Sequence, residues 1–418
     1  MRVNRIDGAR LWSDLEALAG IIDFGSTPFT RRAFGPAYAE ARHWLVGRME
    51  EAGLVVRRDA VGTVIGSTPR TRSLPPIVLG SHIDTVEGGG RFDGALGVLA
   101  ALEVARTLAD SGETLNHPLE IVDFTAEEPN PYGSSCIGSR AWAGTLNQQL
   151  LERTDVDGET LADALPLAGG DPRRIDEARR APGSVAAYLE LHIEQGPVLE
   201  REGASVGIVT GIVSIRRVSV ILSGRASHAG TTPMDVRQDA LPAAAELVLA
   251  VERTARASGG ELVATVGKAH IEPNAPNVIP GRAELSLEVR SLSHRLCDAA
   301  LDEVGQTARA AAKARGLNVD IRERSRLDTV AADERIVQAL ERGCTSIGVR
   351  AMQLPSWGGH DTSLISLIAP VGMIFAPSRG GLSHHPDEWT SPDQCAEAAD
   401  ALLAGLRELD RSFAADRG

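Results

Sequence analysis

The strongest constraint on the fold is a change of pattern in the middle of the chain. On either side of it, short apolar runs such as Ile77–Leu79 and Val371–Phe375 alternate with longer helical patterns such as Ala95–Leu108. This alternation is typical of an α/β sheet with helices on both faces. From about Val213 to Arg324, strand-like stretches instead bracket two Ala-rich helices. Their order, strand-helix-strand-strand-helix-strand, predicts a compact α+β insert of the ferredoxin-like type.

The interrupted pattern predicts two domains, one of them discontinuous. Residues 1–212 and 325–418 form the α/β domain, and residues 213–324 form the insert. A length of 418 residues allows roughly two to three domains of ordinary size, so this division fits the chain. We therefore expect the two halves of the outer domain to pack together.

Charge and cysteine usage exclude several classes of protein. The 43 Lys and Arg residues against 56 Asp and Glu residues give a net charge of -13, which argues against nucleic acid or an anionic membrane as partner. No C-x-x-C pair occurs, so neither a disulfide framework nor a cysteine zinc site is indicated. The N-terminal stretch Met1–Gly20 resembles an amphipathic helix without a signal-peptide core, and the apolar run Leu364–Phe375 is too short to span a bilayer. We expect a soluble, cytoplasmic protein.

A histidine and an aspartate follow the first buried strand. His82 and Asp84 stand just after the run Ile77–Leu79, at the carboxyl end of a strand, where open α/β sheets build their sites. His82 is a candidate metal ligand, and Asp84 a candidate to accept the other imidazole N–H and fix its tautomer. Taken alone, such a pair is more often a solvated surface pair.

Two further acidic segments occupy similar places. Asp93 ends a Gly-rich stretch that leads into a helix, and Glu127 and Glu128 follow the strand-like run Ile121–Phe124. Taken by itself, Asp93 would be interpreted as the N-cap of the helix that follows it. Glu127 and Glu128 by themselves would be interpreted as a solvated acidic turn. A phosphate-binding loop is excluded because neither G-x-G-x-x-G nor G-x-x-x-x-G-K is present. Adjacent carboxylates in a crevice repel each other, and the repulsion is relieved if one binds a metal while the other holds or awaits a proton.

Two more histidines complete the pattern. His192 follows a strand-like run, and His384 follows a Gly-rich turn near the end of the chain. A single histidine in such a position more often has a structural role than binds a metal. Together with the carboxylates, however, they predict a site for zinc, manganese, cobalt or nickel, the ions that suit histidine and carboxylate ligands.

The chain closely resembles the hydantoinase/carbamoylase family of amidases over nearly its whole length. That family includes N-carbamoyl-L-amino acid hydrolases, allantoate amidohydrolases and β-ureidopropionases, within a superfamily of two-zinc aminoacylases and exopeptidases. The motifs that carry the resemblance, in order, are Ser81-His82-Ile83-Asp84, Gly90-Arg91-Phe92-Asp93-Gly94, Glu127-Glu128, His192-Ile193-Glu194-Gln195-Gly196, Ser227-His228-Ala229-Gly230-Thr231-Thr232-Pro233-Met234, Pro276-Asn277-Val278-Ile279-Pro280-Gly281, Gly359-His360-Asp361 and Ser383-His384-His385-Pro386.

The resemblance implies a role for each candidate in the outer domain. His82 and His192 would be terminal ligands of one metal, Glu128 and His384 of the other, and Asp93 would bridge the two. Glu127 would be the general base, and Gln195 would contact substrate. Peptidase relatives usually have a carboxylate at the position of His192, so this histidine favours the carbamoylase branch.

The resemblance also assigns three residues of the insert, together with Gly359 of the outer domain. His228 would stabilise the oxyanion, Asn277 and Gly359 would contact substrate, and Arg290 would grip its carboxylate. The insert would be the dimerisation domain, so a homodimer is implied. Without the resemblance, Arg290 would be interpreted as a solvated charged residue at the end of a strand, and His228 as a residue that caps a turn.

The expected function is therefore two-metal hydrolysis of a small, carboxylate-bearing ureido or amide compound. N-carbamoyl-L-amino acids are the first expectation, with allantoate, ureidopropionate or N-acyl amino acids as alternatives. A non-catalytic metal-containing binding protein and a metal-independent Ser or Cys hydrolase are rivals from other classes; the second lacks a G-x-S-x-G elbow. Pro129 and Trp357 depart from the usual family pattern, which puts transfer of any one substrate in doubt.

Overall fold

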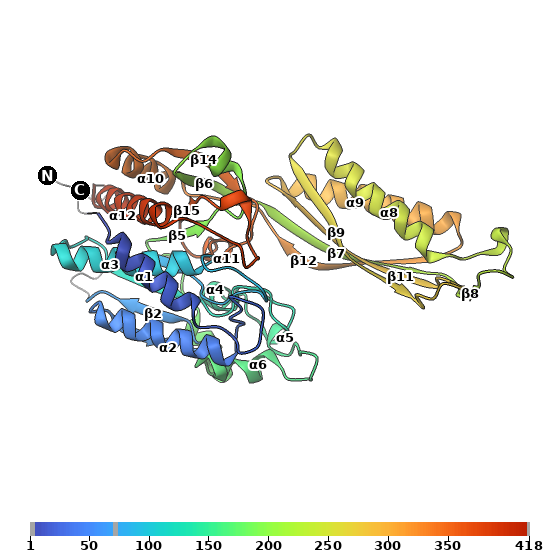
Figure 1. Ribbon diagram of the computed structural model, residues 1–418, viewed down its shortest axis with the longest axis horizontal. Coiled ribbons are helices and arrows are strands. Elements are labelled where there is room, and N and C mark those ends of the chain that lie inside the picture. Colours follow the sequence, from blue (N-terminus) through green and yellow to red (C-terminus); the bar gives the residue numbers. More distant parts are fainter. Residues whose placement is uncertain (1–4, 70–73, 416–418) are drawn as a thin grey trace. The chain divides into compact units, whose positions relative to one another are not determined.

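The computed structural model describes residues 5–69 and 74–415 and divides the chain into two compact units (Figure 1). The first unit runs to Thr210 and resumes over Ala332–Leu354 and from His360 onward. The second unit consists of Gly211–Ala331 and Pro355–Gly359. It contains the whole of the predicted insert, 213–324, and also takes 211–212, 325–331 and Pro355–Gly359, which the sequence had placed in the outer domain.

A mixed sheet forms the centre of the first unit, in the order β1-β2-β4-β3-β5-β15-β6, with β14 also paired to β6. Its middle strands β4, β3, β5 and β15 are parallel, and antiparallel strands flank them. The middle strands are buried along their whole length, which requires cover on both faces as predicted. The strands are β1 (Val55–Arg58), β2 (Val64–Ser67), β3 (Ile77–Ser81), β4 (Leu119–Asp123), β5 (Ala187–Ile193), β6 (Val206–Ile212), β14 (Ala351–Ser356) and β15 (Val371–Ala376).

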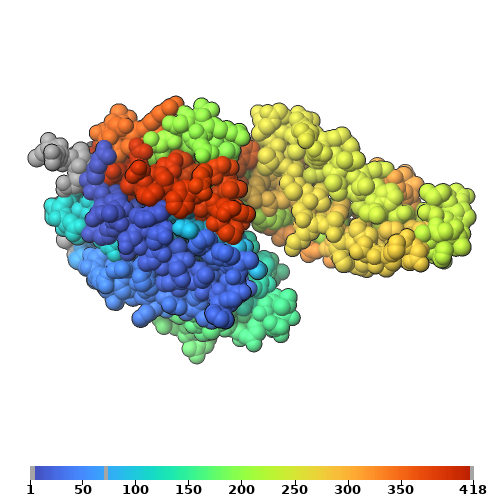
Figure 2. Space-filling model, in the orientation of Figure 1, coloured from blue at the N-terminus to red at the C-terminus, as the bar shows by residue number. Residues whose placement is uncertain are grey.

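Helices from both ends of the chain cover this sheet. Helix α3 packs on β3, β4 and β5, while α12 packs on β5 and β15. Helix α1 packs against both α3 and α12, so the first and last described helices lie side by side (Figures 1 and 2). The predicted helix Ala95–Leu108 is confirmed and continues to Ser111, where Gly112 in the left-handed region ends it.

The helices of the first unit, in chain order, are α1 (Gly8–Ala19), α2 (Pro36–Glu51), α3 (Ala95–Ser111), α4 (Ile137–Ala143), α5 (Gln148–Leu151), α6 (Leu161–Ala164), η1 (Leu165–Ala168), η2 (Pro172–Ala178), α7 (Val198–Glu202), α10 (Glu334–Ile347), α11 (Asp361–Ile365), η4 (Arg379–Gly381) and α12 (Pro392–Ala415). The predicted N-terminal helix thus begins at Gly8, and residues 1–4 lie outside the described chain.

The second unit is the predicted α+β fold. Its antiparallel sheet has the order β12-β7-β11-β9, and α8 and α9 pack on one face. Strand β11 alternates buried and half-buried residues, as a strand with one face on a core must. The elements are β7 (Ser214–Ser223), β8 (Ser227–His228), η3 (Met234–Val236), α8 (Ala240–Ala257), β9 (Leu262–Glu272), β10 (Val278–Ile279), β11 (Arg282–Ser291), α9 (His294–Ala314), β12 (Asn318–Leu327) and β13 (Val330–Ala331).

Two expectations drawn from composition can be compared with the described residues. None of their helices combines the length and apolar character needed to cross a membrane. All four cysteines are buried and unpaired, which agrees with the absence of a disulfide framework. These are Cys136, Cys297, Cys344 and Cys395.

Candidate metal centre

The candidate ligands meet at one edge of the sheet of the first unit. His82 follows β3, Glu127 and Glu128 follow β4, and His192 stands near the end of β5. Because β3, β4 and β5 are parallel neighbours, their carboxyl ends lie at the same edge. This is the position at which open α/β sheets bind ligands.

Asp93 lies in the middle of the candidate ligands. Its Oδ1 atom is 3.2 Å from His192 Nε2 and 3.6 Å from His82 Nε2. Its Oδ2 atom is 3.2 Å from His384 Nε2, and that nitrogen is 3.4 Å from Glu128 Oε1. The carboxylate of Asp93 therefore faces two histidines with one oxygen and a third histidine with the other.

These separations are those of atoms that share a cation. Two nitrogen or oxygen ligands of a tetrahedral metal, each bound at about 2.0–2.1 Å, lie roughly 3.3 Å apart. Two groups meet the requirement, with all ligand atoms of a group within 4.8 Å of one another: His82 with Asp93 and His192, and Asp93 with Glu128 and His384. The residues present therefore fit two cations that share Asp93.

A third group of potential ligands, formed by Glu190, His192 and His360, is a weaker candidate. The carboxylate of Glu190 already accepts hydrogen bonds from the hydroxyl of Ser81 at 2.7 Å and from the hydroxyl of Thr362 at 2.6 Å. Its oxygens are therefore satisfied without a metal.

The electrostatics of the cluster also favour a cation. Burial disfavours the charged forms of His82 and His192, but the charges of Glu127 and Asp93 respectively raise the pKa of each imidazole above its ordinary value. Burial, reinforced by the charges of Asp93 and Glu127, raises the pKa of Glu128 well above its ordinary value. Positive charge is thus favoured at this place, and divalent cations supply it while competing with protons for the same atoms.

Close packing explains why glycines precede and follow Asp93. A Cβ atom on Gly94 would lie 2.4 Å from the ring of His82, and Gly94 has a φ of +64°. A Cβ atom on Gly90 would lie 1.9 Å from the carboxylate of Glu388. The Gly-rich stretch therefore allows the loop that carries Asp93 to fit between these two side chains.

Asp84, the predicted partner of His82, contacts both His82 and the segment after β4. The Nδ1 atom of His82 is 3.1 Å from the backbone oxygen of Asp84 and 3.6 Å from its carboxylate. The carboxylate of Asp84 instead accepts the backbone N–H groups of Glu127 at 3.2 Å and Glu128 at 3.1 Å. Asp84 thus fixes the segment after β4, and its carbonyl oxygen orients the imidazole.

The proposed base, Glu127, is held by a residue that the sequence did not single out. The thiol of Cys136 donates to Glu127 Oε1 at 3.3 Å, while Oε2 lies 3.6 Å from His82 Nε2. Burial raises the pKa of Glu127. A raised pKa and one oxygen directed toward the ligand cluster are the properties expected of a general base.

Three polar side chains surround Asp93. The side-chain amide of Gln195, a predicted substrate contact, donates to Asp93 Oδ2 at 2.7 Å and so touches a candidate ligand. The hydroxyl oxygen of Ser383 lies 2.8 Å from the same Oδ2 and 3.0 Å from Glu388 Oε2. Ser383 and Glu388 were not predicted to take part in the site, although both lie within five residues of His384.

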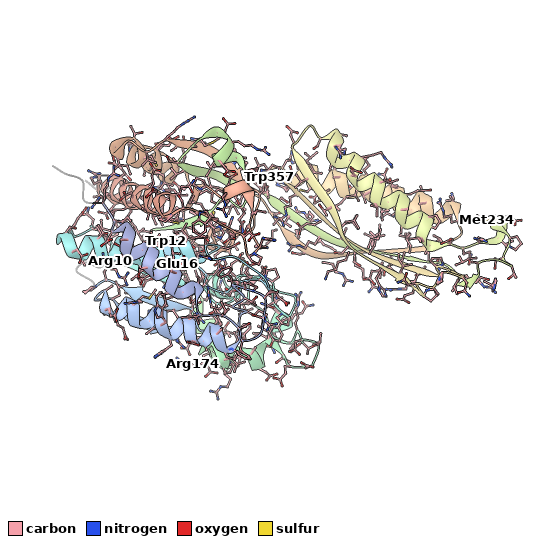
Figure 3. All side chains as sticks on the ribbon, viewed as in Figure 1. Arg10, Trp12, Glu16, Arg174, Met234 and Trp357 are labelled. Carbon is pink, nitrogen blue, oxygen red and sulfur yellow. The ribbon has the colours of Figure 1, made fainter. Side chains whose placement is uncertain are left out.

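Aromatic rings support the loop that carries Asp93. The ring of Trp12, labelled in Figure 3, stacks on Phe92 with centroids 5.8 Å apart. Trp389 meets both rings edge-on, at 5.5 Å from Trp12 and 5.8 Å from Phe92. Helix α1 and the segment after Glu388 thereby anchor the residue that precedes Asp93.

Two predicted residues of the second unit lie close together, His228 on β8 and Asn277 just before β10. His228 on β8 pairs with Val278 on β10, and the carbonyl oxygen of Asn277 accepts the N–H of Ala229 at 2.9 Å. The Nδ1 atom of His228 accepts the backbone N–H groups of Gly230 at 3.0 Å and Thr231 at 3.1 Å. In a neutral ring, the proton therefore stands on Nε2, which is free to donate.

Arg290 is already engaged in this structure. Its guanidinium donates to Glu288 Oε1 at 2.7 Å and to the backbone oxygen of Trp357 at 2.5 Å (Figure 3 labels Trp357). Gly359 lies two positions after Trp357, is exposed, and belongs to the same unit as Arg290. A substrate carboxylate at Arg290 would have to replace or share the contact with Glu288.

Comparisons with known proteins identify the family of the chain. Residues 78–408 match the peptidase family M20/M25/M40. An N-carbamoyl-L-amino acid amidohydrolase of Geobacillus stearothermophilus is 42% identical over 97% of this chain and 99% of that protein. A ureidoglycolate hydrolase of Arabidopsis thaliana is 34% identical over 97% of this chain and 87% of that protein. The solved structure of a hydantoinase/carbamoylase family amidase from Burkholderia vietnamiensis is 32% identical, with a TM-score of 0.87 over 98% of both chains.

The mixed sheet, with histidine and carboxylate donors at the carboxyl ends of its parallel strands and an α+β unit inserted in the chain, is that of a metal-dependent hydrolase. More narrowly, the chain belongs to the hydantoinase/carbamoylase amidases within peptidase family M20/M25/M40.

Proposed function

We propose that this chain is an amidohydrolase that cleaves the ureido C–N bond of N-carbamoyl-L-amino acids at a centre of two divalent cations. The observation that carries the proposal is the position of Asp93 between two groups of ligand atoms, with Glu127 beside one of them. The names of the most similar relatives support the ureido substrate class.

His82 and His192 would hold one cation, Glu128 and His384 the other, and Asp93 both. Zinc is the first choice, and manganese, cobalt and nickel suit the same ligands. When bound, such cations polarise a carbonyl group and increase the acidity of the attacking water.

Glu127 would accept a proton from this water and return it to the departing nitrogen. The water oxygen bonds to the ureido carbon as the first C–N bond breaks, and the carbamic acid so formed loses carbon dioxide when the second C–N bond breaks. One water and one N-carbamoyl amino acid thus give the amino acid, ammonia and carbon dioxide. The contact from Cys136 occupies Oε1, so Oε2 is the oxygen that takes the proton.

The second unit would supply the remaining contacts. His228 Nε2–H would donate to the developing oxyanion, Asn277 and Gly359 would contact the substrate, and Arg290 would bind its carboxylate in a bidentate manner. Gln195 is proposed to contact substrate in addition to its bond with Asp93.

We further propose that the protein works as a homodimer joined through the second unit. Leu241, Val248 and Leu249 are exposed on α8 at 44%, 39% and 53%, with the spacing of one helix face. Val263 on the edge strand β9 is exposed at 47%. Exposed apolar residues beside a free strand edge are typical of an interface. The buried, unpaired cysteines fit a reducing, cytoplasmic setting.

A turnover screen of the metal-reconstituted protein tests this function. N-carbamoyl-L-amino acids should give the highest kcat/KM, above ureidopropionate, allantoate, ureidoglycolate and N-acetyl or N-formyl amino acids. A higher value for one of the others would contradict the proposed substrate class. Absence of turnover in every case, with metal bound, would favour the rival of a metal-containing binding protein.

A further inference from the structure

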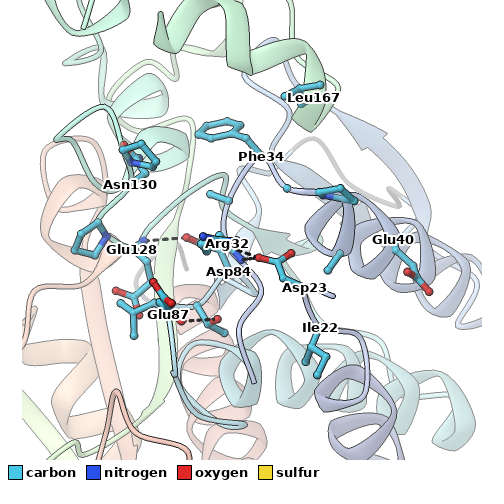
Figure 4. Close-up of a pocket in the computed structure, with 18 of the residues that line it drawn as sticks. Ile22, Asp23, Arg32, Phe34, Glu40, Asp84, Glu87, Glu128, Asn130 and Leu167 are labelled. Atoms are coloured by element: carbon cyan, nitrogen blue, oxygen red, sulfur yellow. Dashed lines mark hydrogen bonds and ion pairs between the residues drawn. The ribbon is translucent and has the colours of Figure 1, made fainter. Parts of the chain in front are cut away.

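A cavity of about 840 Å³ opens in the first unit beside the candidate metal centre. Its walls come from the segments 22–40, 84–87 and 128–132 and from Leu167, and Figure 4 shows Glu128 and Asp84 along it. Small-molecule pockets have volumes of about 300–1,000 Å³. Of the proposed metal ligands, Glu128 lines the cavity, so the cavity adjoins the proposed metal centre at that residue.

Apolar side chains are exposed around the cavity. Ile22, Phe24 and Leu167 have exposed fractions of 40%, 107% and 60%, and all three line it. Deeper in the wall, the rings of Phe34 and Tyr132 meet edge-on with centroids 5.9 Å apart. Large apolar residues gathered around one opening, rather than scattered singly, indicate a binding surface.

The charge on the cavity wall is negative. Arg32 is the one Lys or Arg among the described residues that line it, and its guanidinium is bound to Asp23 at 3.0 Å. Glu40 and Glu87 also line the cavity, are exposed, and make no ion pair with any described residue. An anionic group entering the cavity would meet like charges.

We infer that this cavity binds the side chain of the N-carbamoyl amino acid and selects a bulky, uncharged side chain, aromatic or branched aliphatic. The inference rests on the proposed function and names its substrate class more closely. A substrate without a side chain leaves the apolar surface uncovered, and an acidic side chain is repelled by Glu40 and Glu87. Pro129, which departs from the family pattern, forms part of the same wall.

The test measures kcat/KM of the metal-reconstituted protein for N-carbamoylglycine, N-carbamoyl-L-phenylalanine and N-carbamoyl-L-glutamate. Filling an apolar pocket changes kcat/KM by roughly ten-fold or more, so the phenylalanine derivative should exceed the glycine derivative by that factor. The glutamate derivative should be the poorest of the three. Equal values for glycine and phenylalanine, or a preference for glutamate, would overturn the inference.

Two sets of variants locate the preference in the cavity. Leu167→Ala should lower kcat/KM for the phenylalanine derivative by about four-fold or more, because burial of one CH₂ group against substrate changes kcat/KM by about that factor. The kcat/KM for the glycine derivative should not change. Leu367→Ala is the matched control, because Leu367 is exposed at 58% in the same unit and does not line the cavity. Glu87→Gln should raise kcat/KM for the glutamate derivative by about two- to five-fold.

The outcomes separate the two proposals. If no N-carbamoyl amino acid is hydrolysed, the proposed function fails. If N-carbamoylglycine is hydrolysed but Leu167→Ala affects glycine and phenylalanine derivatives equally, the function stands and the cavity is not the side-chain site.

Discussion

The carboxylate of Glu388 accepts a hydrogen bond from the backbone N–H of Asp93 at 3.1 Å, although the two residues lie 295 positions apart. The same oxygen accepts the N–H of Phe92 at 2.8 Å, and the hydroxyl of Ser383 joins the two carboxylates. Burial, with the charge of Asp93, raises the pKa of Glu388 to about 7. Glu388 therefore connects the loop of the central candidate ligand to the segment that carries His384.

Glu388→Gln should weaken metal binding by about 10- to 100-fold, the effect usual for residues that orient metal ligands. The amide retains the shape of the side chain but changes its charge and its contact with Ser383. Metal affinity is measured by competition with a chelator. Glu200→Gln is the matched control, because Glu200 accepts the N–H of Gly380 at 2.8 Å outside the ligand cluster. Equal affinities in both variants would remove Glu388 from this role.

Glu127→Gln should retain the metals and lose turnover by roughly 10² or more, because the amide cannot accept the proton of the water. Metal analysis and steady-state kinetics on the same preparation decide the matter. A variant that keeps more than about a tenth of the wild-type rate would show that Glu127 is not the base.

Chelation should abolish activity, and Zn²⁺, Mn²⁺, Co²⁺ or Ni²⁺ should restore it, since histidine and carboxylate ligands discriminate poorly among these ions. Elemental analysis should approach two cations per chain, the number proposed for the ligands around Asp93. Full activity in a metal-free preparation would refute the proposed mechanism.

His228 is predicted to act on the active site of the partner subunit. His228→Ala alone should lower the rate by roughly 10² to 10³ with metal content unchanged, the cost of losing one oxyanion donor. If His228 works in trans, mixing this variant with Glu127→Gln should restore activity, because each mixed dimer regains one intact site. Labelled subunits establish that exchange has occurred. Exchange without recovery would place His228 in the site of its own chain, or in none.

The sequence predicted the fold and the cluster of candidate ligands because both depend on local patterns. A parallel strand directs the residue after its carboxyl end to a common edge, so the positions of His82, Glu128 and His192 followed from where the strands end. The metal-binding roles themselves remain predictions. Resemblance to a family was needed for His228 and Arg290, which have no comparable local signal.

Contacts between distant loops were beyond the reach of the sequence. The bonds of Gln195, Ser383 and Glu388 around Asp93 depend on how separate turns pack, not on periodicity. The same applies to the contact of Cys136 with Glu127 and to the engagement of Arg290 by Glu288. The sequence did not predict the cavity because most of its wall, residues 22–40 and Leu167, comes from segments that carry no motif.

The unequal burial of the three histidines has a kinetic consequence. The side chains of His82 and His192 are only 2% and 1% exposed, whereas that of His384 is 46% exposed and its residue has a φ of +53°. Solvent and competing ligands would therefore reach a cation held by Glu128 and His384 far more easily than one held by His82 and His192. The two cations should leave in a fixed order, with a species that retains only the inner ion, and the lifetime of the enzyme in dilute chelator should be set by release of the outer one.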